Sequence, residues 1–129
     1  MNQETCTFEE VIDFVETWLI TGKLNTGMLA ESFRFSSPFW KQANKVEFIA
    51  QFADPRVYTE TALSKITHFD PVIQLQDQYK KHFAIVLQYH TRNGHAVYET
   101  VLGAYEQGYV TELISMYDLE ETKKALELV

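Results

Sequence analysis

Hydrophobic residues recur with two different periods along the chain, and the period changes near its middle. Between Thr7 and Ile20 the apolar side chains follow the i, i+3, i+4, i+7 spacing of an amphipathic helix. Thr7 and Glu10 have the spacing of an N-terminal capping box, and Gly22 fits the left-handed residue that ends many helices. The pattern therefore predicts a long first helix that packs one face against a core.

Shorter elements are expected before the change of period. A second helix is predicted over residues 26–31, and the alternation of apolar and polar residues over 33–37 predicts a strand. Asn44 begins another capping box, which predicts a third helix that the Asp54-Pro55 step closes.

From residue 57 onward, β-branched and aromatic residues between turn signals predict strands. Asn93-Gly94 is the strongest hairpin signal, because a type I′ turn needs two residues that tolerate positive φ, and Gln107-Gly108 predicts a second tight turn. If both loops have two residues, the numbers of paired residues add up to 187 in the first hairpin and 215 in the second. Because paired residues share a face, this register assigns every side chain to one side of the sheet.

The order of elements predicts the fold class. A further strand is expected over residues 64–76 and a short helix over 118–129. Helices followed by a meander of strands give an α+β architecture, with three N-terminal helices packed on a strongly curved antiparallel sheet. A length of 129 residues suits a single domain, 1–129, and the longest apolar run of five residues is too short to cross a bilayer.

The balance of charge narrows the classes of partner. The chain has 11 basic and 18 acidic side chains and a net charge of −7, which disfavours nucleic acid and anionic membranes because both need a basic surface. No leader segment is recognisable at the start, and the single cysteine, Cys6, cannot form an internal disulfide. A cytoplasmic protein that binds neither nucleic acid nor membrane is therefore expected.

Three stretches resemble the nuclear-transport-factor-2-like superfamily, which has a cystatin-like fold and includes the SnoaL-like polyketide cyclases and the ketosteroid isomerases. They are Phe-Arg-Phe-Ser-Ser-Pro at residues 33–38, the helix beginning near Asn44, and the segment from Glu106 to Asp118. The resemblance extends over nearly the whole chain. It implies a cone in which the long first helix and the curved sheet enclose a pocket.

The same resemblance implies where the family enzymes place their catalytic groups, and this chain lacks each of them. Ser37 occupies the position of the isomerases' general base, although a hydroxyl is too weak a base near neutral pH. Val15 occupies the position of their phenol donor. Ser115 occupies the position of a catalytic aspartate in the limonene-epoxide hydrolases.

The face that the predicted register turns toward the pocket carries five hydroxyl groups on three adjacent strands. They can orient a small ligand while aromatic side chains bury its apolar part. Alternatively, the tyrosines simply fill the wide end of the sheet and reach water with their hydroxyls. The predicted ligand-binding residues are Trp18, Phe35, Ser37, Tyr89, Tyr98, Thr100, Ser115 and Tyr117.

The four histidines do not have the spacing of a metal site. His82 and His90 lie eight residues apart on one strand, which separates them by about 26 Å, and no carboxylate or cysteine completes a tetrahedral set. No metal and no cofactor are therefore expected. His68 is a candidate for a catalytic base, because its strand borders the expected pocket and Asp70 can orient its ring.

The opposite face of the predicted sheet is too apolar for a face that meets water. A contiguous apolar strip usually marks a partner site, and members of the superfamily commonly pair sheet to sheet, so a two-fold homodimer is expected. Alternatively, a helix or the C-terminal tail covers the strip. The predicted interface residues are Val86, Gln88, Val97, Val101, Ile114 and Met116.

Three functions stay open on this basis. Binding of a small, largely apolar ligand in the cone is favoured. An isomerase, cyclase or hydratase acting on a polyketide- or steroid-like substrate would need His68 or an acid that the predicted register misplaces. An interaction module would have a cone filled by its own side chains. A pocket that contains an acid of shifted pKa would favour the enzyme.

Overall fold

A six-stranded sheet and three α-helices make up the part of the chain that the computed structural model describes, namely residues 7–40, 42–54, 56, 59–60, 62–77 and 81–127. Cys6 lies outside these residues. Every described helix is too short or too polar to cross a bilayer. The elements are α1 (Phe8–Thr21), η1 (Thr26–Met28), β1 (Leu29–Ser36), β2 (Ala43–Asn44), α2 (Lys45–Phe52), η2 (Leu63–Lys65), β3 (Ile66–Gln76), β4 (His82–Thr91), β5 (Ala96–Glu106), β6 (Tyr109–Met116) and α4 (Leu119–Ala125).

Both predicted capping boxes are present and begin the two main helices. The Thr7 hydroxyl accepts a hydrogen bond from the Glu10 amide at 3.1 Å, and the Glu10 carboxylate accepts one from the Thr7 amide at 2.9 Å. Asn44 caps α2 in the same reciprocal way. Gly22 ends α1 with a φ of 78°, as predicted. Local sequence therefore defines where these helices begin and where α1 ends.

The second predicted helix is wrong. Residues 26–31 form only one 3-10 turn, η1, before the chain enters β1 at Leu29. Gly27 disfavours a longer helix because of its backbone freedom, and the Asn25 side chain accepts from the Gly27 amide at 3.1 Å, which stabilises a tight turn instead. The third described α-helix is the C-terminal α4, so the α-helices are not all N-terminal.

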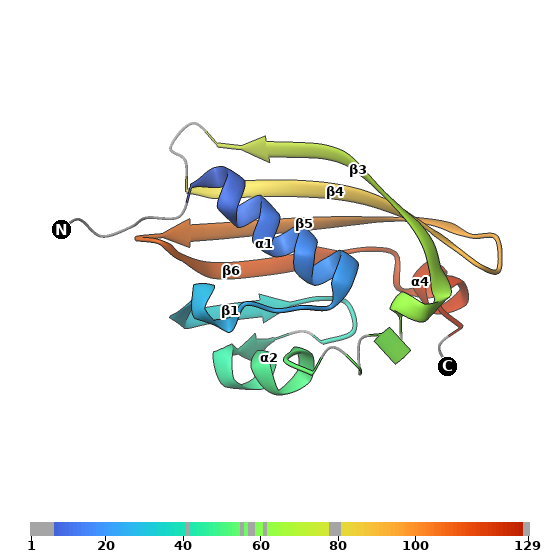
Figure 1. Cartoon of the computed structure of the whole chain (residues 1–129), viewed down its shortest axis with the longest axis horizontal. Helices are drawn as coiled ribbons and strands as arrows, with labels where there is room; N and C mark the ends of the chain where they lie inside the picture. Colours follow the sequence, from blue (N-terminus) through green and yellow to red (C-terminus); the bar gives the residue numbers. More distant parts are fainter. Residues whose placement is uncertain are drawn as a thin grey trace.

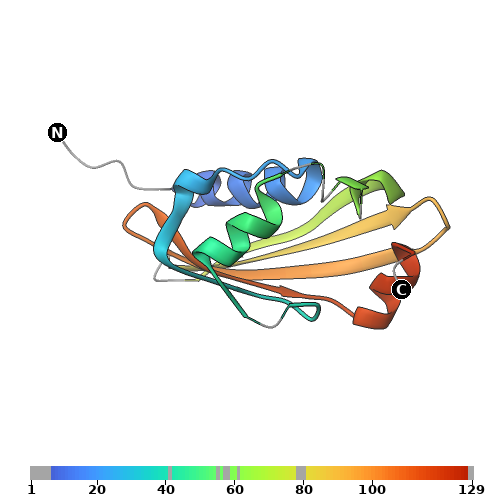
Figure 2. The ribbon, with the colours of Figure 1, turned by 90° about the horizontal axis from the view of Figure 1, so that it is seen from below.

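The sheet has the strand order β2-β1-β6-β5-β4-β3 and is curved (Figure 2). Four of its pairs are antiparallel, whereas β1 runs parallel to β6, so the sheet is mixed rather than purely antiparallel. The helices α1 and α2 lie on one side of it (Figure 2), and α4 lies at the end of the sheet where β4 turns into β5 (Figure 1). The predicted α+β fold class is confirmed.

The pairing of β4 with β5 differs from the prediction by one residue. His90 pairs with Ala96, and the loop between the strands has three residues, 92–94, rather than two. Of these loop residues only Gly94 has a positive φ, 88°, which is the form of a type I turn followed by a left-handed residue. The Thr91 hydroxyl supports this longer loop by accepting from the His95 amide at 3.1 Å.

The second hairpin has the predicted two-residue turn, with φ values of 52° at Gln107 and 86° at Gly108. A β-bulge between Ala104 and Tyr105 then shifts the pairing of β5 with β6 by one residue. The two shifts cancel over residues 112–116 of β6, so the predicted faces of β4 and of this part of β6 hold. Val110, which the predicted register turns outward, is instead fully buried in the core. Strand β5 is reversed. Its inward residues are Val97, Glu99, Val101 and Gly103, and its outward residues are Tyr98, Thr100, Leu102 and Ala104.

Most of the core lies between α1 and the inner face of the sheet. Val11 and Val15 on α1 are fully buried, and so is Val101 on β5. A smaller cluster joins Tyr89 and Val97 to Ala125 and Leu126 at the end of α4. The C-terminal helix is thereby fixed against the sheet at the end away from the start of α1.

Residue 103 has to be glycine because the ring of the residue paired with it on β4 occupies the space of a side chain. It pairs with Phe83, and a Cβ atom at residue 103 would lie 2.2 Å from the Phe83 Cζ atom. Gly103→Ala is therefore expected to lower the free energy of unfolding by about 1–3 kcal/mol, which chemical denaturation measures. Adding Phe83→Leu to Gly103→Ala should recover part of this loss, whereas strictly additive losses would contradict the proposed clash.

Candidate functional site

A cavity of about 570 Å³ lies between the ends of α1 and α2, the inner face of the sheet and α4. The described part of the cone is therefore not filled by its own side chains, contrary to the interaction-module alternative. The lining residues are Trp18, Leu19, Phe35, Ser37, Phe39, Trp40, Gln51, Phe52, Ala62, Tyr89, Glu99, Ser115, Tyr117 and Thr122.

Aromatic rings form much of the cavity wall. Trp18, near the end of α1, contacts the Phe35 ring at 6.1 Å and the Phe52 ring at 5.2 Å, in both cases edge to face. The ring centroid of Trp40 lies 6.3 Å from that of Phe52. Both tryptophans of the chain are thus cavity residues. Rings in mutual contact hold the wall in one arrangement.

A tight turn after β1 brings further side chains to the cavity. The Ser37 amide donates to the Trp40 carbonyl at 2.9 Å, and the Trp40 amide donates to the Ser37 hydroxyl at 3.1 Å. Ser37 also forms a side-chain hydrogen bond with Tyr117, which follows β6. The turn therefore connects the end of β1 to the end of β6 and places Phe39 and Trp40 on the wall.

Glu99 is the single carboxylate among the described residues of the wall. It lies on the inner face of β5 between Val97 and Val101, which are 4% and 0% exposed. Burial disfavours its charged form and raises the pKa of the Glu99 carboxyl from 4.5 to about 7, while a hydrogen bond with the Ser115 hydroxyl acts in the opposite direction. No lysine, arginine or histidine stands among these wall residues to neutralise it.

Two tyrosines share the electrostatic environment of Glu99. Burial, and secondarily the negative charge of Glu99, raises the pKa of the Tyr89 phenol. Burial also raises the pKa of the Tyr117 phenol, and the charge of Glu99 adds to it. Both phenols therefore stay neutral hydrogen-bonding groups over the whole physiological range. Glu99 is left as the group of the wall that changes charge near neutral pH.

The structure places most of the predicted ligand-binding residues on the cavity. Trp18, Phe35, Ser37, Tyr89, Ser115 and Tyr117 line it. Tyr98 and Thr100 do not, and their assignment is wrong. Tyr98 is 58% exposed on the outer face. The cause is the three-residue loop before β5, which reverses the face of that strand alone.

His68 does not reach the cavity, so its assignment as a base in the pocket is wrong. It pairs with His90 on β4, whose side chain lies on the opposite face from Tyr89. The expected pairing with Asp70 does occur, since the His68 Nε2 atom lies 2.7 Å from one Asp70 carboxylate oxygen. His90 Nε2 lies 3.3 Å from the other oxygen. No cluster suited to a metal ion occurs among the residues that the structure describes.

The reversed face of β5 also corrects the predicted homodimer interface. Val97 and Val101 are buried in the core and cannot belong to an outer surface. Leu102 takes their place on that side of β5, on the same face as Tyr98. The outer face is still apolar, because Leu102 and Met116 are 37% and 49% exposed. Four of the predicted residues stay on it: Val86, Gln88, Ile114 and Met116.

Sequence reasoning missed Glu99, the residue with the most distinctive chemistry in the cavity. One signal for it was present. The set Val97, Glu99, Val101 and Gly103 alternates along β5 and contains two β-branched apolar residues and one acid, which is the pattern of an inward face with an isolated functional group. Trp40 and Thr122 gave no signal, because tertiary packing alone brings them to the wall.

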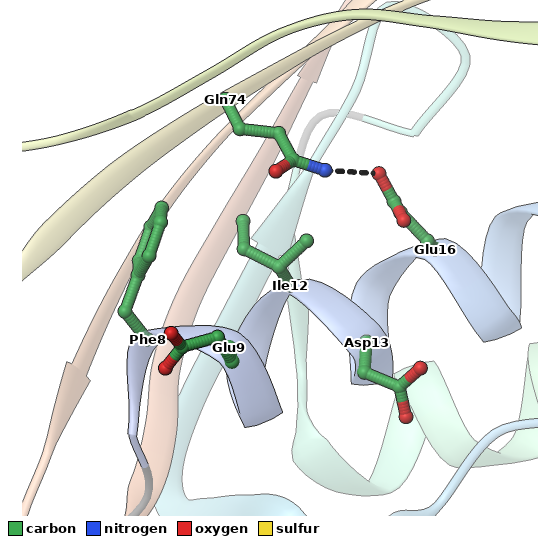
Figure 3. Close-up of a pocket in the computed structure, with 6 residues that line it drawn as sticks. All are labelled: Phe8, Glu9, Ile12, Asp13, Glu16 and Gln74. Carbon is green, nitrogen blue, oxygen red and sulfur yellow. Dashed lines mark hydrogen bonds between the residues drawn. The ribbon is translucent and has the colours of Figure 1, made fainter.

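A second, smaller hollow of about 220 Å³ lies between the first turns of α1 and β3 (Figure 3). Glu9, Asp13 and Glu16 stand along its helix side. On its other side the Gln74 amide donates to the Glu16 carboxylate at 2.7 Å, as the dashed line in Figure 3 marks. None of the predicted site residues lies there. The larger cavity is therefore the candidate functional site.

Comparison with known proteins defines the fold. No protein-family model and no curated protein sequence matches the chain. An NTF2-like protein from Cytophaga hutchinsonii matches in structure with 16% identity, 93% of this chain and 96% of that chain covered, and a TM-score of 0.60. A bacterial protein with a cystatin-like fold from Silicibacter pomeroyi matches with 17% identity, 90% and 79% covered, and a TM-score of 0.65.

A third structure is that of a protein with a ketosteroid-isomerase-like fold from Catenulispora acidiphila, in complex with trimethylamine. It matches with 13% identity, 91% of this chain and 94% of that chain covered, and a TM-score of 0.59. The chain therefore has the NTF2-like, cystatin-like cone fold that the sequence resemblance implies. The fold alone does not define what the cavity does.

The raised pKa of Glu99 has a consequence for stability. Between pH 4.5 and about 7 the folded chain holds this proton while the unfolded chain releases it, so stability falls as the pH rises through this range. Above pH 7 the cost reaches at most about 3 kcal/mol. Glu99→Gln is therefore expected to be more stable than the wild type at pH 8 and equally stable near pH 4.5, in thermal or chemical unfolding.

A matched control is Glu112→Gln, which removes a carboxylate from an exposed position of β6. This variant should follow the wild type at both pH values. A gain from Glu99→Gln that stays the same at pH 4.5 and pH 8 would contradict the assignment of Glu99 to a desolvated site.

Proposed function

We propose that this chain binds a small, largely apolar molecule in the cavity, with Glu99 as the polar group that orients it. The observation that carries the proposal is the position of the Glu99 carboxyl within an aromatic wall. A volume of about 570 Å³ is in the range of small-molecule sites. The wall has the usual composition of such sites, since apolar rings predominate and a few polar groups converge.

Two further points support binding rather than a purely structural cavity. An ionisable carboxyl in an apolar environment costs stability, and such a cost is typical of functional sites. In addition, the Catenulispora acidiphila protein of the same fold was solved in complex with a small organic molecule, trimethylamine. This complex supports small-molecule binding as a function that the fold can serve.

The binding proposal can be tested with N-phenyl-1-naphthylamine, a neutral probe that fluoresces in apolar cavities. Gln51 is exposed and lies at the cavity, so Gln51→Phe should obstruct it and weaken probe binding by about tenfold or more. Val46→Phe is the control, because Val46 lies on the same helix, is 75% exposed and does not line the cavity. Equal probe binding by both variants would contradict the proposal.

Proton transfer is the second candidate function. The specific observation that favours it is the pKa of Glu99, about 7, which suits a general acid or base near neutral pH. Glu99 would then do the work that the family enzymes assign to positions occupied here by Ser37 and Ser115. An isomerase, cyclase or hydratase activity that is lost in Glu99→Gln would favour this candidate over binding alone.

We also propose that the chain forms a two-fold homodimer through the outer face of the sheet. The cross-strand neighbours Leu102 and Ile114 are central to this face, and Met116 and Tyr98 continue it. No described helix covers these side chains, since Tyr98 and Met116 are about half exposed. Contiguous exposed apolar surface of this kind favours association of two copies face to face.

Leu102→Glu places a charge on this face and should give a folded monomer in sedimentation velocity, because its side chain points out of the core. Val101→Glu, one residue earlier, should instead abolish folding in circular dichroism, because Val101 is fully buried. A wild-type protein that sediments as a monomer at micromolar concentration would contradict the dimer.

Three expectations from the sequence stay predictions. They are a single domain over residues 1–129, a cytoplasmic location, and the absence of nucleic acid and membrane partners, which rests on the net charge of −7.

A further inference from the structure

We propose that the ligand of the cavity is a cationic amine, whose alkylated ammonium group pairs with Glu99 inside the aromatic wall. This inference rests on the small-molecule binding proposed above and names the chemical class of the ligand. Three properties of the wall support it: its charge, its aromatic rings, and the large part of it that offers no hydrogen-bond acceptor.

The charge of the wall favours a cation. Glu99 has no basic side chain beside it among the described cavity residues, and a carboxylate in an apolar environment is stabilised most by an opposite charge. An anionic ligand would meet Glu99 and the field of a chain with a net charge of −7. Carboxylate- and phosphate-bearing molecules are therefore disfavoured, and a ligand that supplies the missing positive charge is favoured.

The rings of the wall favour the same class. Seven of the fourteen lining residues are aromatic, and ring faces attract cations within about 6 Å. Trp18 and Trp40 belong to this set, and indole is the strongest of the natural rings in this role. Alkyl groups on the nitrogen also bury apolar surface against the rings. An alkylated ammonium is thus stabilised both by attraction of its charge to the ring faces and by burial of its alkyl groups.

The hydrogen bonds of the wall distinguish alkylated from primary amines. A primary ammonium has three N–H donors that all need acceptors when they leave water. The Ser37–Tyr117 and Ser115–Glu99 hydrogen bonds use part of the capacity of these side chains, and the rings of Trp18, Phe35, Phe39, Trp40 and Phe52 offer no acceptor. A nitrogen whose hydrogens are replaced by carbon has no such requirement. The cavity therefore suits tertiary or quaternary ammonium groups.

The charge state of Glu99 makes this binding dependent on pH. The titratable groups that face Glu99 are Tyr89 from β4 and Tyr117 after β6, and both stay neutral because burial raises their pKa values. The other polar neighbours, Ser115 on β6 and Thr122 on α4, carry no charge. A permanent cation should accordingly bind the ionised form of Glu99 and promote release of its proton.

The test uses benzyltrimethylammonium, whose charge does not change with pH, and follows the fluorescence of Trp18 and Trp40. With a Glu99 pKa of about 7, the cation should bind about tenfold more tightly at pH 8 than at pH 6. Glu99→Gln should bind it weakly and equally at both pH values. Glu112→Gln should behave as the wild type, because its residue lies on the outer face of β6.

Neopentylbenzene is the neutral control, since it has the same shape with carbon in place of nitrogen. It should bind the wild type and Glu99→Gln alike, without tightening at pH 8. Equal affinity for the cation at pH 6 and pH 8, or tightening that persists in Glu99→Gln, would overturn the cationic ligand. If N-phenyl-1-naphthylamine still binds in that case, only this inference fails. If no probe binds, the proposed function fails with it.

Discussion

The three-residue loop between β4 and β5 determines how the central part of the sheet is paired. At the end of β4, the Thr91 hydroxyl accepts a hydrogen bond from the His95 amide. Within the loop, the Asn93 side chain donates to the Lys124 carbonyl at the end of α4 at 3.0 Å. The loop therefore sets the face of β5 and anchors the helix that contributes Thr122 to the cavity. The acid in the wall depends on this connection, which also adds a hydrogen bond to the apolar contacts that hold α4.

The sequence alone predicted the elements whose position depends on interactions between residues close together in the chain. Capping boxes at Thr7 and Asn44 marked the two main helices, and the turn at Gln107-Gly108 formed as predicted. The Asn93-Gly94 pair did not determine the length of the loop between β4 and β5, because it is compatible with loops of two or three residues. In the three-residue form, Asn93 donates to the Lys124 carbonyl of α4, 31 residues away in sequence, and the Thr91 hydroxyl accepts from the His95 amide.

The cavity residues were predicted correctly wherever the predicted strand pairing gave the correct face of the sheet. Six of the eight proposed ligand contacts line the cavity. Two of them, Ser115 and Tyr117, do so because the bulge beside Tyr105 compensates the loop error for the end of β6. On β5 no compensation exists, so Tyr98 and Glu99 exchange places relative to the prediction. The chemistry changes as a result, since an acid that interacts with Ser115 replaces a hydroxyl cluster as the polar centre of the cavity.

Strand β5 has two sets of side chains that are both compatible with a sheet interior. One set contains Glu99 between two valines, and the other contains Tyr98, Thr100 and Leu102. An insertion or deletion of one residue in the loop before β5 reverses the strand and exchanges one set for the other. A chain of this fold can therefore diversify from an acidic to a hydroxyl-lined cavity without any substitution inside it. A change in the length of the loop between β4 and β5 can therefore change which ligand the cavity prefers.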